Sequence, residues 1–107
     1  MTTVNIEKYL IYPVDIHSDD VSANRGEAQG LSTRKVREIY PDAMLLAWYD
    51  RHSGESRPKL GCDFGDKPGW IVFAETRGGN LSIVVNDGEF IFIYATDPTQ
   101  AGNTPRH

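Results

Sequence analysis

The sequence predicts an α+β domain in which one long or broken helix packs on a mainly antiparallel sheet of four or five strands. A helix-period pattern lies between segments rich in β-branched residues, and short apolar runs separated by turn residues fill the second half. A chain of 107 residues with 39% hydrophobic content is long enough for one core. We expect the order β-α-β-(long loop)-β-β-β, with a single domain over residues 1–95 and a polar, flexible tail over 96–107.

The first strand is expected within residues 4–16, which are rich in β-branched and aromatic side chains. Pro13 has no backbone N–H, so this strand either lies at a sheet edge or ends at Tyr12. A helix-start signal follows, because Ser18 or Asp19 can accept hydrogen bonds from the free N–H groups of a first helical turn.

Helical spacing continues beyond this signal. One side of the predicted helix is mostly apolar, and the opposite side carries Gly26 and Gly30, each of which costs about 1 kcal/mol relative to alanine. Either one long helix tolerates both glycines, or a break near Gly30 lets Ser32 cap a second piece. Pro41 ends the helix. The residues on the apolar side are Val21, Ala28, Ser32, Val36 and Ile39.

The remaining strands are expected at residues 43–49, 70–75, 81–85 and 90–94. The first of these runs (AMLLAWY) is expected to be a central strand covered on both faces. The other three are separated by residues 77–80 (RGGN) and 86–88 (NDG), whose composition is typical of hairpin turns. They therefore predict a three-stranded antiparallel meander.

The last run, residues 90–94 (FIFIY), is apolar on both faces. One face is expected to meet the helix, and the other needs cover from the long loop or from another chain. If this strand also lies at an edge, its free backbone groups invite pairing. A homodimer through this strand is one hypothesis, and the alternative is that the N-terminal strand pairs alongside it and closes the edge.

The long segment 50–69 gathers side chains that can bind or react. Loops of this length in a compact domain are usually functional or disordered, and a solvated excursion is the alternative to a ligand or partner loop. Aromatic residues at strand ends beside the loop could line a pocket or pack in the core. The candidate residues for this loop are Asp50, His52, Cys62, Asp63, Trp48 and Trp70.

The 50–69 loop also carries side chains that could form a reactive site. His52 and Cys62 could form a nucleophilic pair if the fold brings them together. Asp63 is adjacent to Cys62 and opposes thiolate formation, and the spacing of these residues matches no familiar metal-binding pattern. We therefore predict no catalytic residue, metal or cofactor, and an enzyme is the less favoured class.

Composition argues against several other classes of protein. The net charge is −4, from 11 basic and 15 acidic residues, and the basic residues are scattered, so a nucleic-acid partner is disfavoured. The single cysteine cannot form an internal disulfide. No apolar run approaches the length of a membrane span, and no basic-then-apolar leader precedes the domain. These features predict a soluble cytoplasmic protein.

The stretches YPDAMLLAWYD and KPGWIVFAETRGGNLSIVVNDGEFIFIYA, with the isolated Cys62, resemble a group of small, conserved but uncharacterised prokaryotic domains of unknown function. The resemblance covers residues 18–95 and implies a stand-alone domain without bringing an activity, cofactor or catalytic residue. We expect a small binding or assembly module, a homodimer, that acts through the sheet face and the 50–69 loop on a protein or small-molecule ligand. The alternative is a small enzyme or metal/redox protein that uses Cys62 with His52 and a nearby carboxylate.

Overall fold

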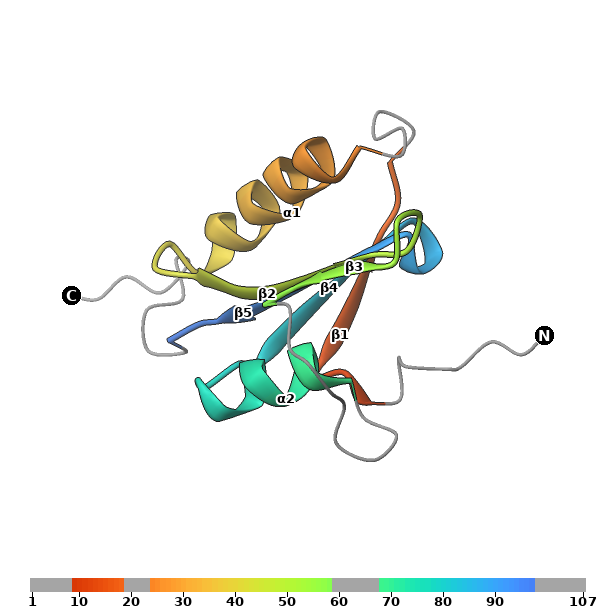
Figure 1. Cartoon of the computed structure of the whole chain (residues 1–107). Helices are drawn as coiled ribbons and strands as arrows, with labels where there is room; N and C mark the ends of the chain where they lie inside the picture. Colours follow the sequence, from red (N-terminus) through yellow and green to blue (C-terminus); the bar gives the residue numbers. More distant parts are fainter. Residues whose placement is uncertain (1–8, 19–23, 59–67, 98–107) are drawn as a thin grey trace.

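The computed structural model describes residues 9–18, 24–58 and 68–97. Its centre is a five-stranded mixed sheet in the order β1-β4-β5-β2-β3, with α1 on one face and α2 on the other (Figure 1). The α+β class is confirmed, with two helices and a sheet that is not wholly antiparallel. The elements are β1 (Pro13–Ile16), α1 (Arg25–Ile39), β2 (Met44–Asp50), β3 (Glu55–Arg57), α2 (Gly69–Thr76), β4 (Leu81–Val85) and β5 (Phe90–Ala95).

The connection from β1 to β2 organises the sheet. β1 pairs with β4 in parallel, whereas β4 with β5, β5 with β2, and β2 with β3 are antiparallel pairs. β1 and β2 therefore run in the same direction, and α1 is the crossover between them. Since β4 and β5 are inserted between the two strands, the arrangement is a split βαβ unit. It places β1 at the edge of the sheet.

Pro13 suits this edge position. The N–H of Ser82 donates to the carbonyl of Tyr12 at 3.3 Å, so the backbone groups of Tyr12 face β4. Successive residues of a strand direct their backbone groups to alternate sides, and those of Pro13 and Asp15 therefore point away from the sheet. The missing N–H of Pro13 costs no hydrogen bond and removes one donor that an incoming strand would use. The predicted edge strand is confirmed, although it starts only at Pro13 in the described chain.

Asn24, rather than Ser18 or Asp19, caps the described helix. The Asn24 side-chain oxygen accepts from the N–H of Glu27 at 3.2 Å, and α1 begins at the next residue after the cap. Ser18 lies before the helix, and Asp19 is outside the described residues. Only the N–H groups of the first helical turn lack acceptors within the helix, so the capping side chain must lie directly before that turn.

α1 is one continuous helix. It runs through Gly26 and Gly30 without a break, and it ends before Pro41 as predicted. Ala28, Ser32 and Val36 are its buried residues, and they belong to the predicted apolar side. The packing of this side on the sheet outweighs the weak helix propensity of the two glycines.

The prediction of a strand at residues 70–75, and with it the three-stranded meander, is wrong. These residues lie in α2, whose buried side includes Trp70, Ile71 and Ala74. A short apolar run that is buried on most sides lacks the periodicity that distinguishes a strand from a helix. The predicted turn at 77–80 is instead a helix end: Gly78 has φ +88°, and the N–H of Gly79 donates to the carbonyl of Ala74 at 2.8 Å.

The predicted hairpin between β4 and β5 is present. Its turn, Asn86–Gly88, contains two residues other than glycine with positive φ, Asn86 at 49° and Asp87 at 61°. Asn and Asp tolerate this left-handed conformation better than other side chains. The turn chemistry predicted from the NDG sequence is therefore confirmed.

β5 is the buried centre of the sheet. Phe90, Phe92 and Tyr94 pack in the core under α1, and Ile91 and Ile93 pack in the core under α2. All five side chains are at most 1% exposed. The expectation that the second face of this strand needs the long loop or another chain is wrong, because α2 covers it. The proposed reason for a homodimer through β5 therefore does not apply.

The long loop is interrupted by a strand that the sequence pattern did not predict. β3 pairs antiparallel with β2, so that Trp48 lies opposite Arg57 and Asp50 opposite Glu55. β2 lies between β5 and β3, so the strand predicted at residues 43–49 is internal to the sheet, with observed bounds Met44–Asp50. Only Ala47 of this strand is buried and Met44 is exposed, so the expected cover on both faces is incomplete. Neither described helix is long and apolar enough to cross a membrane.

Candidate functional site

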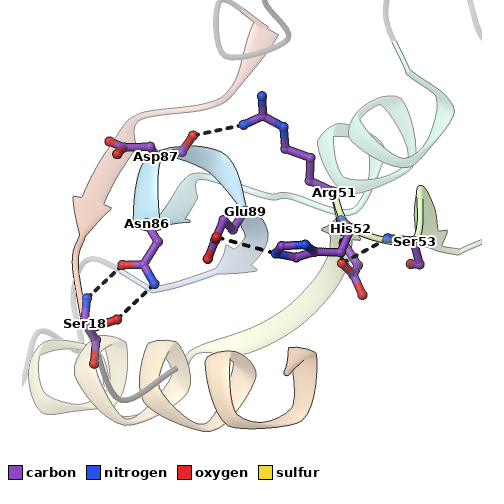
Figure 2. A network of polar contacts seen from close by, with 8 residues as sticks. Ser18, Arg51, His52, Ser53, Asn86, Asp87 and Glu89 are labelled. Carbon is purple, nitrogen blue, oxygen red and sulfur yellow. Dashed lines mark hydrogen bonds and ion pairs between the residues drawn. The ribbon is translucent and has the colours of Figure 1, made fainter. Parts of the chain in front are cut away.

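Of the candidate loop residues, Asp50 is the last residue of β2. His52 lies in the turn that joins β2 to β3 (Figure 2). The Asp50 carboxylate accepts from the backbone N–H of His52 at 2.9 Å and of Ser53 at 3.4 Å, so it shapes the turn. The Nε2 atom of His52 lies 3.5 Å from a carboxylate oxygen of Glu89, and its ring lies 5.6 Å from that of Phe90. Asp50 thus contacts the backbone of the β2–β3 turn, and His52 contacts residues that follow the β4–β5 turn.

A second set of contacts fixes the end of β1 to the β4–β5 turn. The Asn86 side chain accepts from the N–H of Ser18 at 2.8 Å and donates to its carbonyl at 3.0 Å, which imitates strand pairing (Figure 2). Asp87 lies 3.0 Å from His17 and its carbonyl accepts from Arg51 at 3.4 Å. These contacts hold three chain segments together at one end of the sheet.

This polar end offers little reactive chemistry. The side chains of the His17–Asp87 pair are 63% and 87% exposed, and those of His52–Glu89 are 44% and 37% exposed. Ion pairs at such exposure contribute little to stability. Across residues 9–18, 24–58 and 68–97, no group of three or more His, Cys, Asp or Glu side chains is arranged to hold a metal ion. Cys62 and Asp63 lie outside the described residues.

The two candidate tryptophans do not share a pocket. Trp48 packs on the α1 side of the sheet, where the guanidinium carbons of Arg25 and Arg57 lie 4.2 Å and 5.6 Å from its ring centre. Trp70 packs on the α2 side and stacks on Tyr49, with ring centres 5.4 Å apart and an interplanar angle of 2°. Trp48 and Tyr49 are adjacent in β2, so their side chains point to opposite faces of the sheet. Because Trp70 stacks on Tyr49, it lies on the face opposite to Trp48.

A groove that the sequence analysis missed lies between β1 and α1. A helix about 10 Å wide covers roughly two strands spaced about 4.8 Å apart. Since α1 packs on β4 and β5, it leaves β1 beside it rather than beneath it. The space between them has a volume of about 340 Å³. Its lining consists of Tyr12, Val14, Ile16, Lys35, Val36, Glu38, Ile39, Tyr40, Leu81 and Ile83.

The groove concentrates the exposed apolar surface. Four large hydrophobic side chains are exposed in the described chain, and three of them line it: Tyr12 (71%), Val14 (38%) and Ile39 (51%). The fourth, Met44, is on β2 and is not part of the lining. Scattered exposed hydrophobic residues are normal, whereas a contiguous set indicates a contact surface.

The backbone of Tyr12 adds a second distinguishing feature to this groove. Its φ is +45°, in the left-handed region that bulky side chains rarely adopt. Such a conformation costs on the order of 1 kcal/mol and persists where surrounding structure requires it. The strained backbone holds a largely exposed aromatic ring at the mouth of the groove.

A buried polar cluster joins α1 to β5. The Tyr94 hydroxyl hydrogen-bonds with the hydroxyls of Ser32 and Thr33, the latter at 2.8 Å. Burial raises the pKa of the Tyr94 phenol above its ordinary value, although these hydrogen bonds and the charge of Arg37 oppose the rise. The phenol therefore stays neutral at physiological pH and serves packing.

A model of the family described as a domain of unknown function (DUF5619) matches residues 11–94. The chain belongs to this family. Membership confirms the resemblance to uncharacterised prokaryotic domains. The family description carries no activity, cofactor or partner.

The chain is also similar to two individual proteins. An uncharacterized protein from Archaeoglobus fulgidus is 41% identical over 59 residues, which are 55% of this chain and 63% of that protein, so less than two thirds of the relative is matched. The crystal structure of a novel protein from Archaeoglobus fulgidus DSM 4304 superposes with a TM-score of 0.70 at 24% identity, covering 82% of this chain and 96% of that chain. The second similarity supports the fold.

Proposed function

We propose that this domain is a binding module and that the groove between β1 and α1 is its binding surface. The observation that carries the proposal is the gathering of three of the four exposed large hydrophobic side chains of the described chain on this one groove. An apolar contact of this kind gains free energy by removing these side chains from water. The partner therefore presents apolar groups to the groove.

The geometry of the groove supports this role. Its floor is formed by the buried side chains of Val36, Leu81 and Ile83, and the more exposed side chains stand at its sides. A volume of about 340 Å³ lies within the range of known ligand sites. Because Pro13 removes a backbone donor from the β1 edge, recognition by side-chain packing is favoured over strand addition.

Binding of the dye anilinonaphthalene sulfonate, whose aromatic rings bind exposed apolar surface and whose sulfonate group is anionic, tests the proposal. In the variant V14T/I39Q, polar atoms replace methyl groups on two sides of the groove, and we expect dye fluorescence to fall at least threefold. M44Q is the matched control, since Met44 is 61% exposed on another part of the surface. Fluorescence is measured at the lowest protein concentration that gives a signal, and circular dichroism verifies folding. Equal dye binding by the unmodified protein, V14T/I39Q and M44Q would overturn the proposal.

A further inference from the structure

We infer that the occupant of the groove is a second copy of this chain, docked about a twofold axis. The inference rests on the proposed function and names the partner for that same surface. A twofold interface uses one patch twice, so the patch must be complementary to itself. This requirement applies to both the shape and the charge of the groove.

The shape meets the requirement. Leu81 and Ile83 form a concave apolar floor, while Tyr12 and Ile39, more than half exposed, stand at its sides. One surface therefore carries both a hollow and the side chains that fill a hollow. Two copies can each insert Tyr12 into the groove of the other. The contact then buries Tyr12 and Ile39 of both copies, which are exposed in the single chain.

The charges of the groove also match a second copy. Lys35 and Glu38 both line it, one turn apart on α1, and within the described residues neither is in an ion pair. A twofold axis can set Lys35 of each copy against Glu38 of the other, which gives two attractive pairs. A ligand with only one sign of charge would be attracted by one of these side chains and repelled by the other. A second copy satisfies both.

Sedimentation velocity across protein concentrations tests the inference. The unmodified protein should shift from monomer to dimer as its concentration rises. K35E and E38K each convert two attractive pairs into two repulsive ones, and we expect at least a tenfold weaker dimer in each case. An equimolar mixture of K35E and E38K restores opposite charges at both places, so it should dimerise within about threefold of the unmodified protein. R34E is the control, because Arg34 is exposed on α1 and does not line the groove.

Three results would overturn the inference. The unmodified protein could stay monomeric up to about 1 mM, K35E and E38K could dimerise as well as R34E, or their mixture could show no recovery. If dye binding still depends on Val14 and Ile39 in any of these cases, the groove is a binding surface for a different partner and the proposed function stands. If dye binding is also insensitive to both residues, the proposed function fails as well.

Discussion

The Tyr94 hydroxyl allows a sharp test of how α1 packs on the sheet. Tyr94 is 0% exposed in β5, and its hydroxyl contacts Ser32 and Thr33 of α1. The substitution Tyr94→Phe removes this one oxygen and keeps the ring in place. Any change in stability then reports the polar contact between helix and sheet rather than the apolar core.

The expected loss of stability depends on whether the hydroxyls of Ser32 and Thr33 keep other hydrogen-bond partners. The Ser32 hydroxyl retains the Gln29 carbonyl as an acceptor at 3.3 Å, so it is not left without a partner. The substitution removes one to two neutral hydrogen bonds, each with a net contribution of about 1 kcal/mol. We expect Tyr94→Phe to lower the free energy of unfolding by about 1–2 kcal/mol. In a domain of this size, each 1 kcal/mol corresponds to a fall in Tm of roughly 4–8 °C.

The same residue predicts a dependence on alkaline pH. Burial raises the Tyr94 pKa in the folded chain, whereas an unfolded tyrosine titrates near its ordinary pKa of about 10. The neutral phenol therefore contributes fully below about pH 10, and this contribution is lost as the pH rises from there through the folded pKa. Tyr94→Phe should weaken the alkaline loss of stability. Urea unfolding followed by circular dichroism at about pH 7 and about pH 11 measures both effects, and an unchanged midpoint at both values would refute the reasoning.

Two further predictions concern the core and the backbone. Ile93→Lys should unfold the domain, because Ile93 is fully buried under α2 and an unpaired buried ammonium group costs several kcal/mol; a soluble, folded variant with native circular dichroism would show that this face is open. Gly30→Ala should raise the free energy of unfolding by about 0.5–1 kcal/mol, since an added Cβ meets nothing within 4 Å, whereas Gly79→Ala should lower it, since its Cβ would lie 2.9 Å from the Ala74 carbonyl oxygen. Urea unfolding compares the two glycine variants, and effects of the same sign would contradict this geometry.

Much of the fold could be predicted from local patterns. Val36 and Ala28 have helical spacing on the buried side of α1, and the NDG turn between two apolar runs predicts the β4–β5 hairpin. These signals depend only on neighbours in the sequence. Pro13 likewise predicts an edge strand, because its missing N–H is a property of the residue itself.

The secondary structure was predicted wrongly, or missed, where it depends on contacts between segments that are distant in the sequence. The run after Pro68 forms a helix because α2 is buried against β2 and β5, a contact that the run itself does not encode. Gly78 and Gly79 form the C-terminal end of α2, whereas the sequence analysis interpreted them as a hairpin turn. Glycine is common directly after a helix, so this glycine pair after an apolar run was a signal for α2 in the sequence. β3 has a polar sequence and exists through its pairing with β2.

The candidate site was harder to predict than the fold. Trp48 and Trp70 flank the two ends of the predicted 50–69 loop, yet they pack on opposite faces of the sheet. The groove depends on the parallel pairing of β1 with β4, which brings Val14 beside the last turns of α1. Residues so far apart in sequence give no local signal of their proximity.

The groove between β1 and α1 is, on our inference, where two copies of the domain meet. The most direct measurement is a dilution series of methyl NMR spectra of the unmodified protein, from about 1 mM to about 10 µM. We expect concentration-dependent shifts at the methyl groups of Val14, Ile39 and Ile83. The methyl signals of Met44 and Ile71, which lie outside the groove, should keep constant positions. Shifts centred on Met44 or Ile71, or spectra that do not change over the whole series, would contradict it.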